Sequence, residues 1–212
     1  SIASGSNYNV VVGDEAGTDI TTGDKNIAIG FEALYDVSTT SDNVAIGYQA
    51  LKLATSITRN IAIGSLACSG AVVTGDDNIA VGHNAANDLT SGTDNIAIGK
   101  DAAMLINTGA NNVIIGKAVA DALEGGNHNT AIGNGAMSAV NSGNYNVALG
   151  SSSMPSVTTA DSNVCIGYQA GVSIQTGGAN ICIGAASAVD GGGAAGEIAL
   201  GSSVTCTGSN RI

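Results

Sequence analysis

A glycine preceded by an aliphatic residue recurs twelve times along this chain of 212 residues. The interval is 17 residues everywhere except between Gly64 and Gly82, where it is 18. In eleven of the twelve repeats an asparagine stands four residues before the glycine, as in Asn26-Ile27-Ala28-Ile29-Gly30. A repeat this short and regular is typical of stacked-coil architectures, which are more often scaffolds and binding surfaces than catalysts. The twelve glycines are Gly13, Gly30, Gly47, Gly64, Gly82, Gly99, Gly116, Gly133, Gly150, Gly167, Gly184 and Gly201.

Aliphatic residues stand one and three positions before each repeat glycine, as Ile29 and Ile27 do. Because side chains alternate along a strand, these two columns share one face, and we expect that face to line the core. A third apolar column, ten residues before the glycine, is expected to pack against them from the opposite side. Its members are Ile20, Val37, Ala54, Val72, Leu89, Ile106, Leu123, Val140, Val157 and Ile174.

No segment keeps a helical period, and β-branched residues favour strands. The repeat therefore predicts an all-β protein, a parallel β-solenoid of about twelve 17-residue coils with two short strands in each coil. Residues 1–207 are expected to form a single β-roll domain. Residues 208–212 fall out of the repeat phase and are expected to be the start of a following module or a truncated end. The asparagine column suits turns and, when stacked, an asparagine ladder.

The residue between the two aliphatic columns is expected to point out of the coil, yet it is small and apolar. A straight apolar stripe on the outside of a sheet predicts a contact with another copy of the chain. The predicted contact residues are Ala28, Ala45, Ala62, Ala80, Ala97, Ile114, Ala131 and Ala148.

The runs Asn26-Ile27-Ala28-Ile29-Gly30, Asn43-Val44-Ala45-Ile46-Gly47-Tyr48-Gln49-Ala50-Leu51 and Asn95-Ile96-Ala97-Ile98-Gly99 resemble the head repeats of YadA-like trimeric autotransporter adhesins. They are also similar to repeats of phage and bacterial fibres that end in an endosialidase-type, self-cleaving chaperone domain. This resemblance implies a left-handed parallel β-roll, a homotrimer and surface adhesion. It implies no particular receptor.

Charge and composition exclude several function classes. A net charge of −11 with six basic residues argues against nucleic-acid or anionic-membrane partners. No apolar run approaches the roughly 20 residues of a membrane span, so no membrane insertion is expected in this fragment. His83 and His128 lie in different columns, so we expect no metal site. The scattered acids give no preferred catalytic pair, and we expect neither catalytic residues, nor a cofactor, nor enzymatic activity. The acids before the asparagine column are expected to cap turns (Asp24, Asp42, Asp76, Asp77, Asp94 and Asp161).

Recognition is expected at the variable position directly after the repeat glycine, where aromatic residues can stack on sugar rings. The candidate ligand-binding residues are Phe31, Tyr48, Lys100, Lys117 and Tyr168. The alternative is that these are ordinary bend residues covering the edge of the core. Cys165 and Cys182 occupy one column a coil apart, and the sequence leaves open whether they are bonded.

The sequence thus predicts a trimeric segment of an extracellular fibre, on a cell surface or virion. Its partners would be its own copies and a cell-surface glycan or protein. A purely structural shaft with the binding tip elsewhere is the alternative. A polysaccharide-degrading tail spike and ice binding through the Thr-rich surface columns are weaker alternatives.

Overall fold

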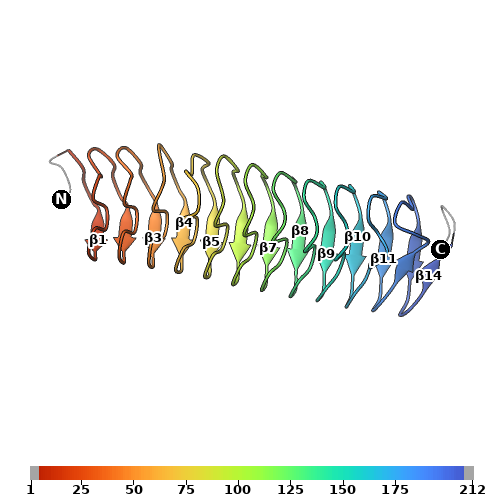
Figure 1. Ribbon diagram of the computed structural model, residues 1–212. Helices are drawn as coiled ribbons and strands as arrows, with labels where there is room; N and C mark the ends of the chain where they lie inside the picture. The colour runs from red at the N-terminus through yellow and green to blue at the C-terminus, as the bar shows by residue number, and fades with distance from the viewer. Residues whose placement is uncertain (1–4, 208–212) are drawn as a thin grey trace.

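The computed structural model describes residues 5–207, which form a stack of β-coils with β1 and β14 at opposite ends of the stack (Figure 1). Twelve strands, one from each coil, form one parallel sheet in the order β1 to β11 followed by β13. Each pairs with the next in register, so that Ile27 of one coil aligns with Val44 of the next. The predicted parallel β-solenoid of about twelve 17-residue coils is confirmed. The strands are β1 (Val10–Val12), β2 (Ile27–Ile29), β3 (Val44–Ile46), β4 (Ile61–Ile63), β5 (Ile79–Val81), β6 (Ile96–Ile98), β7 (Val113–Ile115), β8 (Thr130–Ile132), β9 (Val147–Leu149), β10 (Val164–Ile166), β11 (Ile181–Ile183), β12 (Ala188–Val189), β13 (Ile198–Leu200) and β14 (Thr205–Cys206).

The expected second strand in every coil is wrong for most of the described chain. Only β12 and β14 form a second, two-stranded sheet, with isolated bridges elsewhere. The residues two and four positions after the repeat glycine have left-handed backbone angles, as in Glu32 (φ 51°) and Leu34 (φ 51°). This conformation interrupts strand geometry. Backbone hydrogen bonds still join neighbouring coils there, as from Leu34 N–H to the Ala50 carbonyl.

The repeat glycine is required by two features of the bend that follows each strand. At Gly47, φ is +136°, a region that residues with a side chain rarely adopt. A Cβ at this position would also lie 2.5 Å from the Gly64 carbonyl oxygen of the next coil. Glycine therefore recurs every 17 residues because each coil approaches the next closely at this point.

The core lies on the face of the sheet opposite to the one predicted. The middle residue of each three-residue strand from β2 onward points inward and is buried, whereas the flanking aliphatic residues, such as Ile61 and Ile63, point outward and are half-buried or exposed. Both of the alternating sets of side chains along each strand are apolar, and the set of small side chains fits the thin interior. A side chain added at Gly171 would meet both Cys165 and Ile174, so the middle residue and the third apolar column face each other across the coil.

The third apolar column is otherwise buried as expected, with one exception. In the 18-residue interval Val72 is 50% exposed, and Val73 is fully buried in its place. Val73 forms a bridge with Ala54 of the preceding coil, and β5 pairs with β4 in normal register. The extra residue is therefore absorbed within one coil. The prediction for residues 208–212 falls outside the described residues.

Candidate assembly and ligand-binding surfaces

The eight residues predicted to contact another chain are core residues of a single chain, so that prediction is wrong. All eight are at most 1% exposed and belong to the hydrophobic core. Small apolar side chains at a surface would admit another backbone, but here they make room for larger residues across a thin interior. The eight residues that lie in the core instead of at a chain-to-chain contact are Ala28, Ala45, Ala62, Ala80, Ala97, Ile114, Ala131 and Ala148.

The outward face of the twelve-stranded sheet carries the aliphatic columns instead, and we call it the aliphatic face. Each strand contributes two side chains, such as Ile96 and Ile98 from β6. Ile63 and Ile98 are 37% exposed, and Leu200 is 50% exposed. Twelve strands at ~4.8 Å make this face ~50 Å long. Its members are Val10, Ile27, Val44, Ile61, Ile79, Ile96, Val113, Thr130, Val147, Val164, Ile181 and Ile198 in one column and Val12, Ile29, Ile46, Ile63, Val81, Ile98, Ile115, Ile132, Leu149, Ile166, Ile183 and Leu200 in the other.

The asparagine column forms the ladder that its spacing predicts, but inside the protein. Asn112 is fully buried, its amide nitrogen donates to the Gly126 carbonyl at 2.8 Å, and its Oδ1 accepts from the Asn129 backbone N–H at 2.9 Å. The same contacts recur from coil to coil. In the last repeat Glu197 replaces asparagine, is 3% exposed, and donates its N–H to Asn180 Oδ1 at 3.0 Å. The ladder is a structural element rather than a ligand site, because its polar groups are paired within the chain.

The acids before this ladder cap neighbouring coils, as expected for three of them. Asp24, Asp76 and Asp161 each accept a hydrogen bond from a backbone N–H of the preceding coil. Asp77 instead pairs with Arg59 at 2.5 Å, which raises the pKa of the guanidinium and lowers the pKa of the Asp77 carboxyl. Within residues 5–207, no three His, Cys, Asp or Glu side chains gather as a metal ion would need.

The residues directly after the repeat glycines, which we call the ring column, lie at one edge of the roll, and all of them except the half-buried Ser65 are exposed. Phe31 and Tyr48 stack on each other with ring centroids 5.6 Å apart and an interplanar angle of 14°. They are 40% and 49% exposed, and Tyr168 stands alone at 57%. The structure thus brings together two of the three predicted aromatic residues. The column contains Asp14, Phe31, Tyr48, Ser65, His83, Lys100, Lys117, Asn134, Ser151, Tyr168, Ala185 and Ser202.

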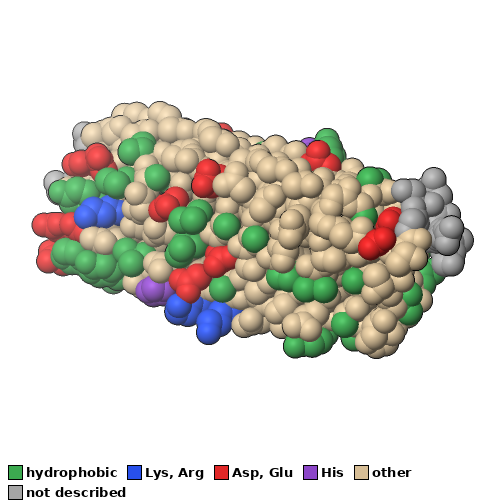
Figure 2. Space-filling view, turned by 45° about the vertical axis from the view of Figure 1, so that its right-hand side comes forward, with side chains coloured by type: hydrophobic (Ala, Val, Ile, Leu, Met, Phe, Trp, Pro, Cys, Tyr) green, Lys and Arg blue, Asp and Glu red, His purple; other side chains and the backbone are tan. Residues whose placement is uncertain are grey.

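Charged groups beside the ring column are mostly compensated. Glu32 accepts from Lys52 at 2.7 Å and from Gln49 at 2.5 Å, and these contacts lower the pKa of its carboxyl. Lys100 bonds to Asp101, and this pairing lowers the pKa of Asp101. Of the two candidate lysines, Lys100 is therefore engaged in an ion pair within the chain. On the flank seen in Figure 2, acidic side chains are spread along the roll and basic ones gather in small groups.

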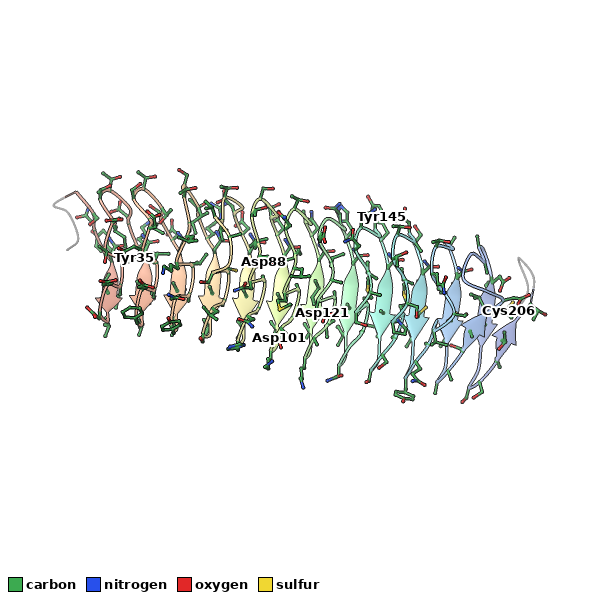
Figure 3. The ribbon with its side chains drawn as sticks, in the orientation of Figure 1. Tyr35, Asp88, Asp101, Asp121, Tyr145 and Cys206 are labelled. Atoms are coloured by element: carbon green, nitrogen blue, oxygen red, sulfur yellow. The ribbon has the colours of Figure 1, made fainter. Side chains whose placement is uncertain are left out.

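A second ring pair lies at the opposite edge and was not predicted. His128 and Tyr145 stack with centroids 4.9 Å apart and an interplanar angle of 4°. Figure 3 shows Tyr145 and Asp101 at opposite edges of the roll. The signal in the sequence was the 17-residue separation of the two rings, which in-register coils convert into contact. His83, at the Asp101 edge, has its Nδ1 3.8 Å from Asp101 Oδ1. The two histidines therefore occupy separate columns, as predicted.

All four cysteines are buried free thiols. Cys165 and Cys182 are neighbours in register on β10 and β11. Burial raises the pKa of the Cys68 thiol to about 12. Hydrogen bonding to Cys182 and burial together raise the pKa of Cys165. These thiols act as small core residues.

No family model matches this sequence, and neither a curated protein nor a solved structure matches it. Among residues 5–207, no helix is long and apolar enough to cross a membrane.

Proposed function

We propose that this chain is a segment of a homotrimeric extracellular fibre that serves in surface recognition. The aliphatic face is the observation that carries the proposal. Soluble monomers rarely expose a contiguous apolar patch larger than a few hundred Å². Here nearly every strand of a twelve-stranded sheet adds two aliphatic side chains to one continuous face. Burying that face against identical copies removes it from water and stabilises the assembly.

The shape of the face favours a closed, parallel arrangement of chains. It runs along the whole stack, so copies aligned side by side cover each other over the full length. Closed cyclic symmetry buries every copy equally. The number three, the left-handed sense of the coil and the role in adhesion come from the resemblance of the repeats to YadA-like heads and fibre repeats.

Surface glycans are the ligand class that we assign to this fibre. Phe31, Tyr48 and Tyr168 present exposed rings at one edge, and hydrogen-bonding side chains such as Gln49 lie beside them. Aromatic faces with a few polar groups are the usual makeup of small-ligand sites. The role as fibre would place the protein outside the cell, on a cell surface or a virion.

A purely structural shaft is the second candidate, and the ladders favour it. Polar side chains that repeat from coil to coil form hydrogen bonds within the chain, as in the asparagine ladder. The hydroxyls of Thr21 and Thr90 likewise donate to carbonyls of the next coil. This pairing also weakens the ice-binding alternative, in which such hydroxyls would order water.

Two neighbouring substitutions on β6 test the assembly. Light scattering after size exclusion should give three times the chain mass of 20.5 kDa for the wild type. Ile98→Glu places a charge on the aliphatic face, so it should give a folded monomer with wild-type circular dichroism. Ala97→Glu buries an unpaired charge in the core and should prevent folding altogether. A stable wild-type monomer, or an Ile98→Glu trimer, would contradict the proposal.

A further inference from the structure

The stack of Phe31 on Tyr48 occupies one face of the Tyr48 ring and leaves the other face toward the following coil. The two rings are nearly parallel, 5.6 Å apart, and come from consecutive coils. The coils continue in register past Tyr48, because Leu66 N–H donates to the Tyr48 carbonyl at 2.9 Å. The residue that follows Tyr48 in the ring column is therefore Ser65, whose side chain is too short to cover the ring.

His83 provides a second ring on the far side of Ser65. Asn84 N–H donates to the Ser65 carbonyl at 3.1 Å, so His83 continues the ring column despite the extra residue later in that interval. The His83 side chain is 48% exposed. Tyr48 and His83 are two coils apart, or ~10 Å at the spacing of neighbouring strands. Stacked rings prefer centroid separations of ~4.5–7 Å, so this interval accommodates one ring between Tyr48 and His83.

Within residues 5–207, two rings separated by one short side chain occur once in the ring column, and the stacked pair at the opposite edge has no such gap. Tyr168 is flanked by Ser151 and Ala185 and has no second ring beyond either. The His128–Tyr145 pair at the other edge is followed by Ser162 and then Ala179. Tyr48 also has Phe31 behind it, which fixes its plane before any ligand binds and lowers the entropic cost of binding.

The groups around Ser65 suit an uncharged ring that carries hydroxyls. Glu32 is paired with Lys52, and Asp101 is paired with Lys100, so neither offers a free counter-charge. Gln49 donates one amide N–H to Glu32 and Asn84 donates one to Asp101, so each amide keeps a second N–H and its oxygen, and the Ser65 hydroxyl adds a further hydrogen-bonding group. The C–H face of a pyranose covers an aromatic ring, while its equatorial hydroxyls reach outward to such groups.

We propose that Tyr48, Ser65 and His83 form a binding site for one uncharged hexopyranose unit, held between the two rings with Ser65 beneath it. The site rests on the proposed function, because it names the sugar class and the place at which the fibre would recognise a glycan. The binding unit is one sugar, so a ligand of this size should bind with a Kd of ~1 mM to each site, and several chains in one fibre would add avidity.

The chain has two histidines, which makes the test direct. Methyl β-glucopyranoside, methyl α-mannopyranoside and methyl β-galactopyranoside are titrated into the intact protein while the imidazole C–H signals are followed by NMR. At least one glycoside should shift the His83 signal in a saturable way. His128 lies at the opposite edge and should not respond, so it is the internal control. Phenol is titrated as a planar aromatic comparator and should bind more weakly than that glycoside.

Filling the gap should abolish binding without disturbing the fold. Ser65→Tyr continues the stack that Phe31 and Tyr48 begin, and it should weaken the responding glycoside at least ~10-fold. Ser151→Tyr makes the same substitution in the same column beside Tyr168, and should leave the affinity unchanged. Tyr48→Ala should also weaken binding, with the assembly mass unchanged.

The outcomes separate this site from the proposed function. No saturable His83 shift with any glycoside, or wild-type affinity in Ser65→Tyr, would overturn the site even if the trimer forms and a glycan array gives binding. Tighter binding of phenol than of any glycoside would overturn the proposal and show that the gap prefers an aromatic ring to a sugar. Loss of the oligomer in Tyr48→Ala would show that the ring belongs to a chain-to-chain contact. A monomeric wild type would contradict the fibre and leave the NMR result to decide the site alone.

Discussion

Cys165 and Gly171 face each other across the interior of the roll, so closely that a Cβ on Gly171 would overlap the Cys165 sulfur. This relation recurs between the middle residue of each strand and the residue six positions later. Where the first is large the second is small, as in Val11 with Gly17 and Ile114 with Ala120. Where the first is alanine, the second can be leucine or methionine, as in Ala148 with Met154.

Gly171→Met is expected to destabilise the protein by ~1–3 kcal/mol, because it overpacks a filled interior. The double variant Cys165→Ala/Gly171→Met recreates the Ala148–Met154 pair of the preceding coil and should recover most of that loss. The left-handed φ of +70° at Gly171 is not the obstacle, since Met154 has a φ of 51° at the corresponding position. Urea unfolding of the two single variants and the double variant gives the coupling energy. Additive effects would show that the two residues do not share one space.

Asn112→Ala is expected to cost ~2–5 kcal/mol, because it leaves the buried N–H of Asn129 and the carbonyl of Gly126 without their partners. Asn111→Ala is the matched control, since Asn111 is exposed and adjacent. Its left-handed φ of 60° limits the expected cost to ~1 kcal/mol. Thermal unfolding of both variants measures the difference. Equal losses would mean that the buried ladder contributes no more than an ordinary surface turn.

Gly47→Ala is expected to cost more than ~3 kcal/mol, because φ is +136° and the new Cβ would approach the Gly64 carbonyl oxygen to 2.5 Å. Gly125→Ala provides the comparison, since a Cβ there meets nothing closer than the Thr108 hydroxyl at 3.4 Å. That substitution should be neutral or stabilise the fold by up to ~1 kcal/mol, by reducing the freedom of the unfolded chain. Chemical denaturation of both variants tests the contrast, which would fail if Gly47→Ala were as stable as the wild type.

Asp121 and Asp77 should affect stability with opposite dependence on pH. Asp121 Oδ1 is buried without a hydrogen-bond partner, and burial with the nearby Asp101 charge raises the pKa of the Asp121 carboxyl. The folded state then binds the proton more tightly, so the penalty is present at neutral pH, fades as the pH falls through the raised pKa, and is gone below the ordinary value of 3.8. Asp121→Ser, which copies Ser138 of the next coil, should raise the melting temperature at pH 7 and lose this advantage in acid.

Asp77 serves as the opposite control because Arg59 lowers the pKa of its carboxyl. Its contribution to stability is present above the ordinary pKa and is lost as the pH falls through the lowered value. Asp77→Ser should therefore lower the melting temperature at pH 7 and match the wild type in strong acid. Melting curves of the two variants from pH 7 downward test both signs, and parallel curves would contradict the assignment.

The glycine period predicted the coils and their register, because an interval of constant length stacks like residues on like. It did not predict which strand face points inward. Ala28 and its neighbours Ile27 and Ile29 are all apolar, so alternation alone fits either choice, and the expectation that the larger side chains are buried gives the wrong face. The size relation between Val11 and Gly17 carried the missing information, because only residues that face each other need to share volume.

Contacts made by three-dimensional stacking were less accessible from the sequence. The Phe31–Tyr48 and His128–Tyr145 stacks join residues 17 positions apart, but the register alone does not give the side-chain orientations that bring the rings face to face. The left-handed angles at Glu32 and Leu34, which replace the expected second strand, had no signature in residue type. Residues with such angles include leucine, alanine and methionine, which sequence rules do not associate with that conformation.

Because neighbouring coils are hydrogen-bonded in register, the number of coils sets the length of this molecule. Every inner coil presents the same bonding groups to both neighbours, so one coil can follow another of its kind without altering the partners of either. Duplication or loss of one coil in the gene would lengthen or shorten the rod by ~4.8 Å while its ends keep their structure. Evolution can thus change the length of such a rod independently of the side chains exposed at its edges.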